Sequence, residues 1–221
     1  MGQWIDLHTA HGVIAAWRAE PVGKPRGAIV VIQEIFGVNA HIRSVAEDFA
    51  SEGYVALAPA LFDVLERGVE LGYDEEGVAR GRDLITRLGL DQALELVDDA
   101  AKSLAGIGAI GTVGYCWGGT VALLAALRLG LPSASYYGAR DVPFLGETPK
   151  APLIFHFGER DKSIPPEMVQ QHRDAWPAIP VHTYDADHGF NCDARASYDA
   201  PSAKLARERT LAFFAEHLAK A

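Results

Sequence analysis

The sequence predicts an α/β fold with a mainly parallel central sheet and helices on both of its faces. Short apolar segments rich in β-branched residues alternate with stretches of helical periodicity along all 221 residues. This alternation is typical of parallel sheets, whose strands are connected by helices. Apolar residues make up 49% and charged residues 22%, as in ordinary soluble globular proteins. Because no repeat, low-complexity tract or linker interrupts the pattern, we expect a single domain over residues 1–221.

Strands are expected where a short apolar run lies between turn residues. An early strand is expected at Ile14–Arg18, next to an N-terminal hairpin. Runs without polar alternation indicate strands that are buried on both faces. The remaining predicted strands are Ala28–Gln33, Tyr54–Ala58, Ala109–Gly114, Ala134–Tyr137, Leu153–Phe157 and Val181–Tyr184.

Helices are expected where apolar residues recur three and four positions apart. The predicted helices are Asn39–Ser51, Glu75–Leu88, Asp91–Leu104, Gly118–Leu129, Pro165–Ala175 and Ser202–Ala219. The fourth of these is apolar on nearly every side, so we expect it to be buried. In the last helix the residues expected to face inward are Leu205, Leu211, Phe214 and Leu218.

The charge balance argues against several classes of partner. There are 20 basic and 29 acidic residues, a net charge of −9, whereas nucleic acid and anionic membranes attract clustered Lys and Arg. No apolar run approaches the about 20 residues that span a bilayer, and Met1–Ala10 lacks the pattern of a secretory signal. The two cysteines, Cys116 and Cys192, are too few for a disulfide scaffold. We expect a cytoplasmic protein, monomeric by default, with free thiols.

The most informative motif surrounds Cys116. A predicted strand runs into Gly114-Tyr115-Cys116-Trp117-Gly118 and directly into a helix, which is the nucleophile-elbow pattern with Cys at its centre. The tight turn needs glycine two residues before and after the nucleophile. The helix N-terminus favours a thiolate at Cys116, and the Trp117 N–H can face a developing oxyanion. The alternative is a buried structural cysteine.

A nucleophile of this kind needs an acid and a histidine later in the chain. Asp161 follows the predicted strand at Leu153–Phe157, and His188 follows the strand at Val181–Tyr184. Parallel strands bring both to one edge of the sheet, where His188 would act as base and Asp161 would orient it. Asp185 and Asp187 compete with Asp161 for the orienting role. The other histidines considered have structural interpretations: His8 and His11 lie in the hairpin, His156 lies within a strand, and His172 and His217 are expected to face solvent or cap helices.

Four segments together resemble the dienelactone hydrolase (carboxymethylenebutenolidase) family, a branch of the α/β-hydrolase fold. They are Gln33-Glu34-Ile35-Phe36-Gly37, the Cys116 motif, Gly158-Glu159-Arg160-Asp161 and His188-Gly189-Phe190. The run Arg207-Glu208-Arg209-Thr210-Leu211 also fits. The resemblance implies a triad of Cys116, His188 and Asp161. It also implies an oxyanion hole formed by the backbone N–H groups of Ile35 and Trp117, and a role for Glu34 in activating the thiol.

The family's substrate is an unsaturated lactone that carries a carboxylate, which arginine is suited to bind. The resemblance points to Arg80 or Arg82 for one arginine. The second is expected four residues after His188, but Cys192 stands there and the nearest arginine is Arg195. Tyr136, Phe36 and Phe190, with Trp117, are expected to form apolar walls.

The sequence therefore predicts a hydrolase of small esters or lactones that needs no metal or cofactor. The first alternative is a broad carboxylesterase or thioesterase acting on another small acyl substrate. A second alternative is a non-catalytic module, such as a small-molecule receptor or thiol sensor. A third treats Asp185, Asp187 and His188 as a metal site.

Overall fold

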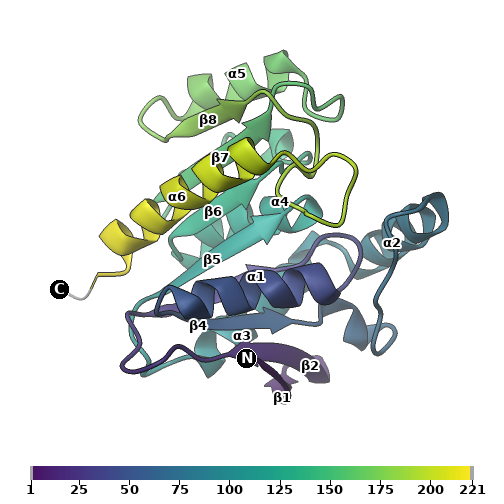
Figure 1. The fold of residues 1–221 in the computed structure, drawn as a ribbon, viewed down its shortest axis with the longest axis vertical. Coiled ribbons are helices and arrows are strands. Elements are labelled where there is room, and N and C mark those ends of the chain that lie inside the picture. Colours follow the sequence, from purple (N-terminus) through teal and green to yellow (C-terminus); the bar gives the residue numbers. More distant parts are fainter. Residues whose placement is uncertain (1, 220–221) are drawn as a thin grey trace. The chain divides into compact units, whose positions relative to one another are not determined.

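The computed structural model describes residues 2–219, and the strands and helices alternate as predicted (Figure 1). The strands are β1 Gln3–Thr9, β2 Gly12–Ala19, β3 Ala28–Ile32, β4 Val55–Pro59, β5 Ile110–Tyr115, β6 Ser133–Tyr136, β7 Leu153–Gly158 and β8 Val181–Tyr184. The α-helices are α1 Ala40–Ser51, α2 Glu75–Leu88, α3 Leu90–Ser103, α4 Trp117–Leu124, α5 Pro166–Ala175 and α6 Ala200–His217. All the predicted elements are present with ends shifted by at most two residues, except that α4 gives way at Ala125–Leu129 to a π-helical segment.

The chain divides into two compact units. Of the described residues, the first contains 2–112 together with Leu218 and Ala219, and the second is Val113–His217. Strand β5 contributes its first residues to one unit and its last residues to the other. The interpretation of residues 1–221 as a single domain stays a prediction.

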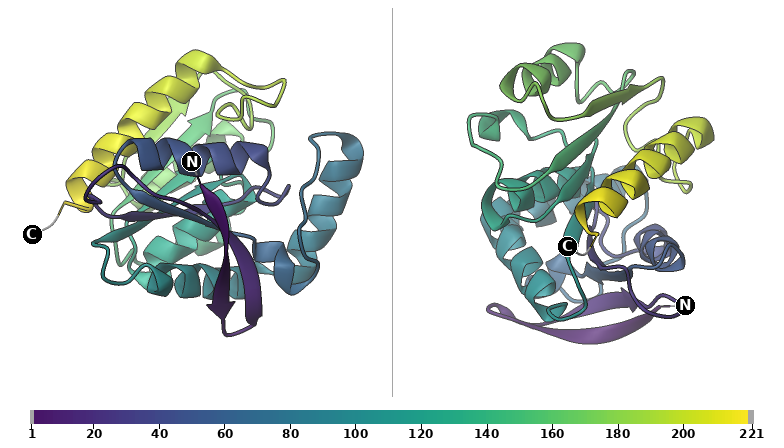
Figure 2. Two further views of the ribbon diagram at one scale, coloured as in Figure 1. Left: turned by 60° about the horizontal axis from the view of Figure 1, so that its bottom comes forward. Right: turned by 90° about the vertical axis from the view of Figure 1, so that its left-hand side faces the viewer.

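In the first unit the strands follow the order β1-β2-β4-β3-β5. Strand β2 pairs antiparallel with β1 and with β4, whereas β3 and β4 are parallel. Figure 2 shows the β1–β2 hairpin as a long twisted ribbon. Asn39 caps the start of α1, where its side chain accepts a hydrogen bond from the Ile42 N–H, and Asp74 caps α2 in the same way through the Gly77 N–H. Both β3 and β4 are buried along their whole length, as their unbroken apolar sequences predict.

In the second unit the order is β5-β6-β7-β8, and β7 is parallel to both of its neighbours. Helices α4 and α5 lie on one face of these strands and α6 lies on the other (Figure 2). Because β7 and β8 are parallel, the loops that follow them leave from the same edge of the sheet. This edge carries both Asp161 and His188.

Two predictions about side-chain exposure are wrong. Leu205 was expected to face inward but is 41% exposed, because the buried stripe of α6 is formed by other residues, namely Ser202, Ala203, Ala206, Thr210, Phe213 and Phe214. His172 was expected to face solvent or cap its helix but is completely buried. Its Nδ1 lies 2.7 Å from the Met168 carbonyl oxygen and its Nε2 lies 3.2 Å from Asp141 Oδ2, so both ring nitrogens have partners in the interior. In both cases tertiary partners, rather than periodicity, decide the burial.

Within residues 2–219, none of the helices combines the length and the apolar composition required to cross a membrane.

Candidate active site

Cys116 stands in a strained turn between β5 and α4. Its φ and ψ of 56° and −120° lie in a region that residues with a Cβ rarely adopt. The backbone can form this turn because Gly114 and Gly119 lie at positions where a side chain would collide with the backbone. A Cβ on Gly114 would overlap the Gly118 carbonyl, and a Cβ on Gly119 would lie 2.6 Å from the Tyr136 carbonyl oxygen. The contact of Gly114 with Gly118 therefore gives a direct steric reason for the glycine that was predicted two residues before Cys116.

Cys116, His188 and Asp161 form a hydrogen-bonded row inside the second unit. His188 Nε2 lies 3.2 Å from Cys116 Sγ, and His188 Nδ1 lies 2.6 Å from Asp161 Oδ2. The Asp161 carboxylate is buried, and its other oxygen accepts a hydrogen bond from the Ser163 N–H at 2.8 Å. This geometry is that of a nucleophile, a base and an orienting acid.

The loops that carry Asp161 and His188 are held together by their backbones. The Glu159 N–H donates to the Tyr184 carbonyl at 2.8 Å, and the Arg160 N–H donates to the Ala186 carbonyl at 2.9 Å. A Cβ on Gly158 would lie 2.5 Å from that same Ala186 oxygen, so the close approach of the two loops requires glycine.

The environment of His188 favours its charged form. Burial alone lowers its pKa, but the hydrogen bonds to Asp161 and Cys116, together with the negative charge of both partners, raise the pKa to about 10. The imidazolium form of His188, held by the Asp161 carboxylate, is thus favoured at neutral pH. A protonated imidazole at this position can donate a proton to a leaving group and can stabilise a thiolate beside it.

The carboxylates adjacent to His188 in sequence have other partners. Asp185 pairs with Arg160 at 3.3 Å, and Asp187 Oδ1 accepts a hydrogen bond from the His188 backbone N–H at 2.6 Å. In the described part of the chain, Asp185, Asp187 and His188 do not bring their ligand atoms together around one point. The orienting carboxylate on the imidazole is that of Asp161.

Aromatic rings line the second unit beside the imidazole. The Tyr137 ring lies 5.1 Å from the His188 ring and 5.4 Å from Phe190. Tyr136, which the sequence favoured as the wall residue, turns its hydroxyl to Thr210 at 2.7 Å and packs its ring 6.4 Å from Phe190. Tyr137 was missed because it lies just beyond β6. Its φ of 40° is one of two positive values among the described residues other than glycine, and nothing in the sequence indicates it.

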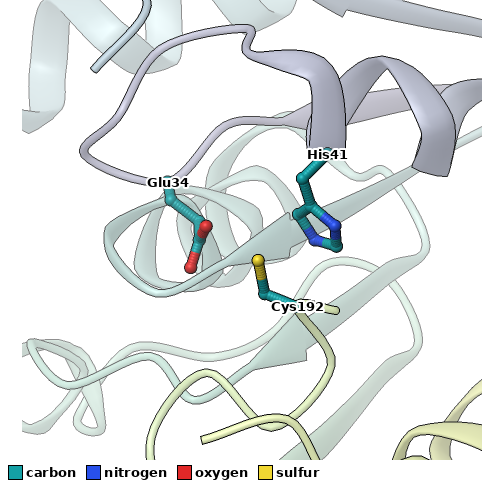
Figure 3. A group of neighbouring side chains, drawn as sticks. All are labelled: Glu34, His41 and Cys192. Carbon is teal, nitrogen blue, oxygen red and sulfur yellow. The ribbon is translucent and has the colours of Figure 1, made fainter. Parts of the chain in front are cut away.

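Glu34, Ile35 and Phe36 lie in the first unit, directly after β3, and all three are buried. Figure 3 draws Glu34 in this loop and His41 in the first turn of α1, with Cys192 on its own loop after β8. Phe36 packs edge-on against Tyr73 at 4.6 Å. A Cβ on Gly81 would overlap the Ile35 carbonyl, so α2 packs tightly on the Ile35 segment. The roles of Glu34 and Ile35 stay predictions.

The three candidate arginines have different surroundings. Arg80 pairs with both Glu66 and Asp83, so its charge is already engaged at the surface. Arg82 is exposed and lines a groove of about 340 Å³ with Tyr73 and other residues at the start of α2. Arg195 lies in the second unit, and a Cβ on Gly189 would overlap its guanidinium. Of the three, Arg195 is the one that this geometry places beside the histidine loop.

Comparison with known proteins agrees with this geometry. Residues 14–218 match the dienelactone hydrolase family. The chain belongs to that family. The predicted class of enzyme, a hydrolase, is confirmed by this membership.

Individual relatives of the dienelactone hydrolase family cover nearly the whole chain. A carboxymethylenebutenolidase from Pseudomonas putida is 32% identical over 96% of this chain and 94% of its own length. A Synechocystis protein provisionally named carboxymethylenebutenolidase is 36% identical over 93% and 92%. A crystal structure from Klebsiella pneumoniae, provisionally named a dienelactone hydrolase, is 29% identical, covers 98% of both chains and has a TM-score of 0.88. The predicted α/β-hydrolase fold is thereby confirmed.

Proposed function

We propose that this member of the dienelactone hydrolase family hydrolyses small esters or lactones with Cys116 as its nucleophile and enol lactones as its preferred class. The observation that supports this proposal most strongly is the row from Asp161 through His188 to Cys116, with contacts of 2.6 and 3.2 Å. The carboxymethylenebutenolidase names of its relatives agree with the substrate class.

In the first half of the reaction the Cys116 thiolate attacks the carbonyl carbon and forms a C–S bond. The carbonyl oxygen becomes an oxyanion, which the Trp117 backbone N–H at the start of α4 stabilises; the family resemblance adds the Ile35 N–H as a second donor. The intermediate then collapses with cleavage of the C–O bond. The departing oxygen takes its proton from the His188 imidazolium, and an acyl-thioester remains on Cys116.

In the second half a water molecule attacks the thioester. His188, now neutral, accepts a proton from the water, and Asp161 keeps the imidazole in the tautomer that can do so. The C–S bond breaks, the carboxylic acid leaves, and the thiolate–imidazolium pair is restored. The resemblance assigns Glu34 to activation of the thiol when substrate arrives.

The thiolate itself restricts the substrate. A thiolate is a good leaving group as well as a good nucleophile, so its tetrahedral intermediate returns to substrate unless the other leaving group departs easily. An enol lactone releases an enolate, which meets this condition, whereas a simple alkyl ester releases a much more basic alkoxide. This argument favours enol or aryl esters and enol lactones over alkyl esters.

Arg195 is the residue we assign to a carboxylate on the substrate. It takes the place of the family's arginine four residues after the histidine, where this chain has Cys192. Its guanidinium lies against Gly189, next to His188. A planar fork at that position is suited to a carboxylate on the acyl part of a lactone.

The test compares initial rates of dienelactone ring opening, followed by ultraviolet absorbance, with rates on a neutral phenyl ester and a neutral ethyl ester. We expect rapid turnover of dienelactone, slower turnover of the phenyl ester and negligible turnover of the ethyl ester. Cys116→Ala should abolish the first two activities. Arg195→Gln should raise KM for dienelactone by about tenfold, the loss of one charged hydrogen bond, and leave the phenyl ester unaffected.

Other outcomes would lead to different assignments. Turnover of phenyl or thioester substrates without dienelactone would identify a broader esterase or thioesterase. A folded wild type with no turnover of any ester, but with a thiol that iodoacetamide alkylates well below pH 8.5, would favour a thiol sensor.

A further inference from the structure

A groove of about 480 Å³ lies in the second unit at the amino-terminal ends of β7 and β8. It is separate from the row at Cys116, which lies at the carboxyl ends of the strands. Its walls come from β7, from the loop between α5 and β8, and from the last two turns of α6, which packs against β7 (Figure 1). A volume of this size is within the range that small organic ligands occupy.

Arg209 projects into this groove with its charge uncompensated. In the described part of the chain it makes no ion pair, and its one hydrogen bond goes to the hydroxyl of Tyr184 at 3.1 Å. The effect of its charge is visible on its neighbours. The pKa of His182, already depressed by burial, is depressed further by Arg209, and the same charge contributes to lowering the pKa of His156.

Arg209 is also held in place. Its guanidinium lies over the Tyr184 ring at 5.3 Å, in addition to its hydrogen bond to that side chain. Tyr184 in turn is fixed by His156, whose Nδ1 lies 2.7 Å from the hydroxyl. The remaining guanidinium donors are thus presented by a side chain that has already lost its rotamer freedom, which lowers the entropic cost of binding.

Beyond Arg209 the lining of the groove is mostly apolar, with His182, His217 and one carboxylate, that of Glu216, as its other polar side chains. Phe213, Ile154 and Ile179 contribute apolar surface, and Glu216 stands two helical turns after Arg209 on the same helix. Seven residues of α-helix separate two side chains by about 10 Å along the axis. One cation, an apolar stretch and a distant anion suit a ligand with one carboxylate and a hydrocarbon body, and disfavour a ligand with a carboxylate at both ends.

We propose that this groove is a second binding site, for a small monocarboxylate with an aromatic or aliphatic body, with Arg209 binding the carboxylate and Phe213 and Ile154 packing on the body. The proposal does not depend on the reaction assigned to Cys116. The carboxylic acids that an ester hydrolase releases belong to this chemical class, so the groove offers a means for product to bind without occupying the catalytic row.

The probe for this site is 3-phenylpropionate, and its uncharged amide is the control ligand. Binding is followed at pH 8 by NMR, through the ring protons of His182. We expect saturable shifts with the carboxylate and about tenfold or more weaker binding of the amide, because a charged hydrogen bond to Arg209 is lost. Carboxylate binding should also raise the pKa of His182, because the ligand offsets the charge of Arg209.

Three variants make the test decisive. Arg209→Gln should weaken the binding of 3-phenylpropionate by about tenfold or more. Arg173→Gln, which changes an exposed arginine on α5, should not change the affinity. Glu216→Lys changes an exposed side chain, so the variant is expected to fold. It should bind 3-phenylpropionate more tightly, because a charge of the same sign as the ligand is removed. The proposal is overturned if the His182 signals show no saturable shifts. It is also overturned if Arg209→Gln leaves the affinity unchanged, because that result would indicate binding elsewhere, such as at the catalytic row.

Discussion

The carbonyl oxygen of Tyr136 accepts a hydrogen bond from the backbone N–H of Cys116 at 3.0 Å, so the end of β6 directly supports the strained turn at Cys116. The side chain of the same tyrosine belongs to a buried polar chain. Its hydroxyl lies 2.7 Å from Thr210 Oγ1, which lies 3.0 Å from His156 Nε2. The residue that positions Cys116 is therefore anchored at both its backbone and its side chain.

The direction of this chain follows from its donors. Burial, with the charges of His182 and Arg209, lowers the pKa of His156 well below its usual value, so the ring is neutral and carries one proton. Arg209 can only donate to Tyr184, which leaves the Tyr184 hydroxyl to donate to His156 Nδ1. The proton of His156 is then on Nε2 and faces Thr210.

Replacing Thr210 with valine breaks this chain with little change in shape. The buried Nε2 of His156 and the Tyr136 hydroxyl each lose a partner, which costs about 1–3 kcal/mol of unfolding free energy per unsatisfied group. We expect urea denaturation to show that loss, together with a lower kcat at unchanged KM. Thr183→Val is the matched control, because its hydroxyl bonds the exposed Glu159, and it should change stability by less than about 0.5 kcal/mol. Equal effects of the two variants would contradict the anchoring role of the chain.

The sequence predicted the elements and the proximity of Asp161, His188 and Cys116 well, for identifiable reasons. Strand ends in a parallel sheet meet at one edge, so Asp161 and His188 could be placed together before any contact was known. The glycines around Cys116 report a steric need that is local to the turn. Neither inference requires knowledge of which side chains meet across the fold.

What the sequence missed depends on tertiary partners. His172 can be buried because Asp141 and the Met168 carbonyl satisfy its ring nitrogens. Thr210 can be buried because its hydroxyl has partners in Tyr136 and His156 on neighbouring strands. No periodicity indicates such pairs. The exchange of Tyr136 for Tyr137 beside His188 has a different origin. Tyr137 lies one residue beyond β6 with a φ of 40°, a backbone conformation that the sequence does not indicate.

Gly119→Ala tests the packing beneath Cys116. The added Cβ would lie 2.6 Å from the Tyr136 oxygen and 3.1 Å from the Gly138 nitrogen, so α4 or the end of β6 must move. Overpacking of this kind costs about 1–3 kcal/mol. We expect a lower thermal midpoint of unfolding. We also expect a lower kcat at temperatures where the variant is still folded, because Cys116 moves with the helix. Gly146→Ala meets no atom within 4 Å and should leave both quantities unchanged.

The interaction between His172 and Asp141 should be among the larger contributions to stability. Both side chains are completely buried, and the other Asp141 oxygen accepts from Thr120 at 2.6 Å. His172→Leu removes one hydrogen-bond partner of the buried Asp141 side chain, which should cost about 1–3 kcal/mol. Asp141→Asn in the same background should then cost much less than it does alone. A double-mutant cycle by urea denaturation measures this coupling, and additive effects would contradict it.

The raised pKa of His188 predicts how stability depends on pH. The folded-state pKa of about 10 lies above the value near 6.5 of an unfolded histidine. The folded protein therefore holds a proton that the unfolded chain releases, and the stabilisation is complete below pH 6.5 and declines as the pH rises toward 10. His188→Gln should lack this component. The urea midpoint of the wild type minus that of the variant should fall steadily over this interval, and a difference that rises with pH would show that the sign is wrong.

The same pKa predicts the pH profile of the reaction. In the proposed mechanism His188 must carry a proton to release the leaving oxygen, so kcat/KM for dienelactone should hold at alkaline pH and decline only near pH 10. Asp161→Asn removes a carboxylate that raises this pKa and favours the wrong tautomer, so the decline should move to lower pH and kcat should fall by about 10²–10⁴-fold. Asp185→Asn removes a nearby carboxylate that pairs with Arg160 instead, and it should leave the decline in place. If the two variants shifted the profile equally, general surface charge, rather than the hydrogen bond at 2.6 Å from Asp161 to His188, would control the proton of the imidazole.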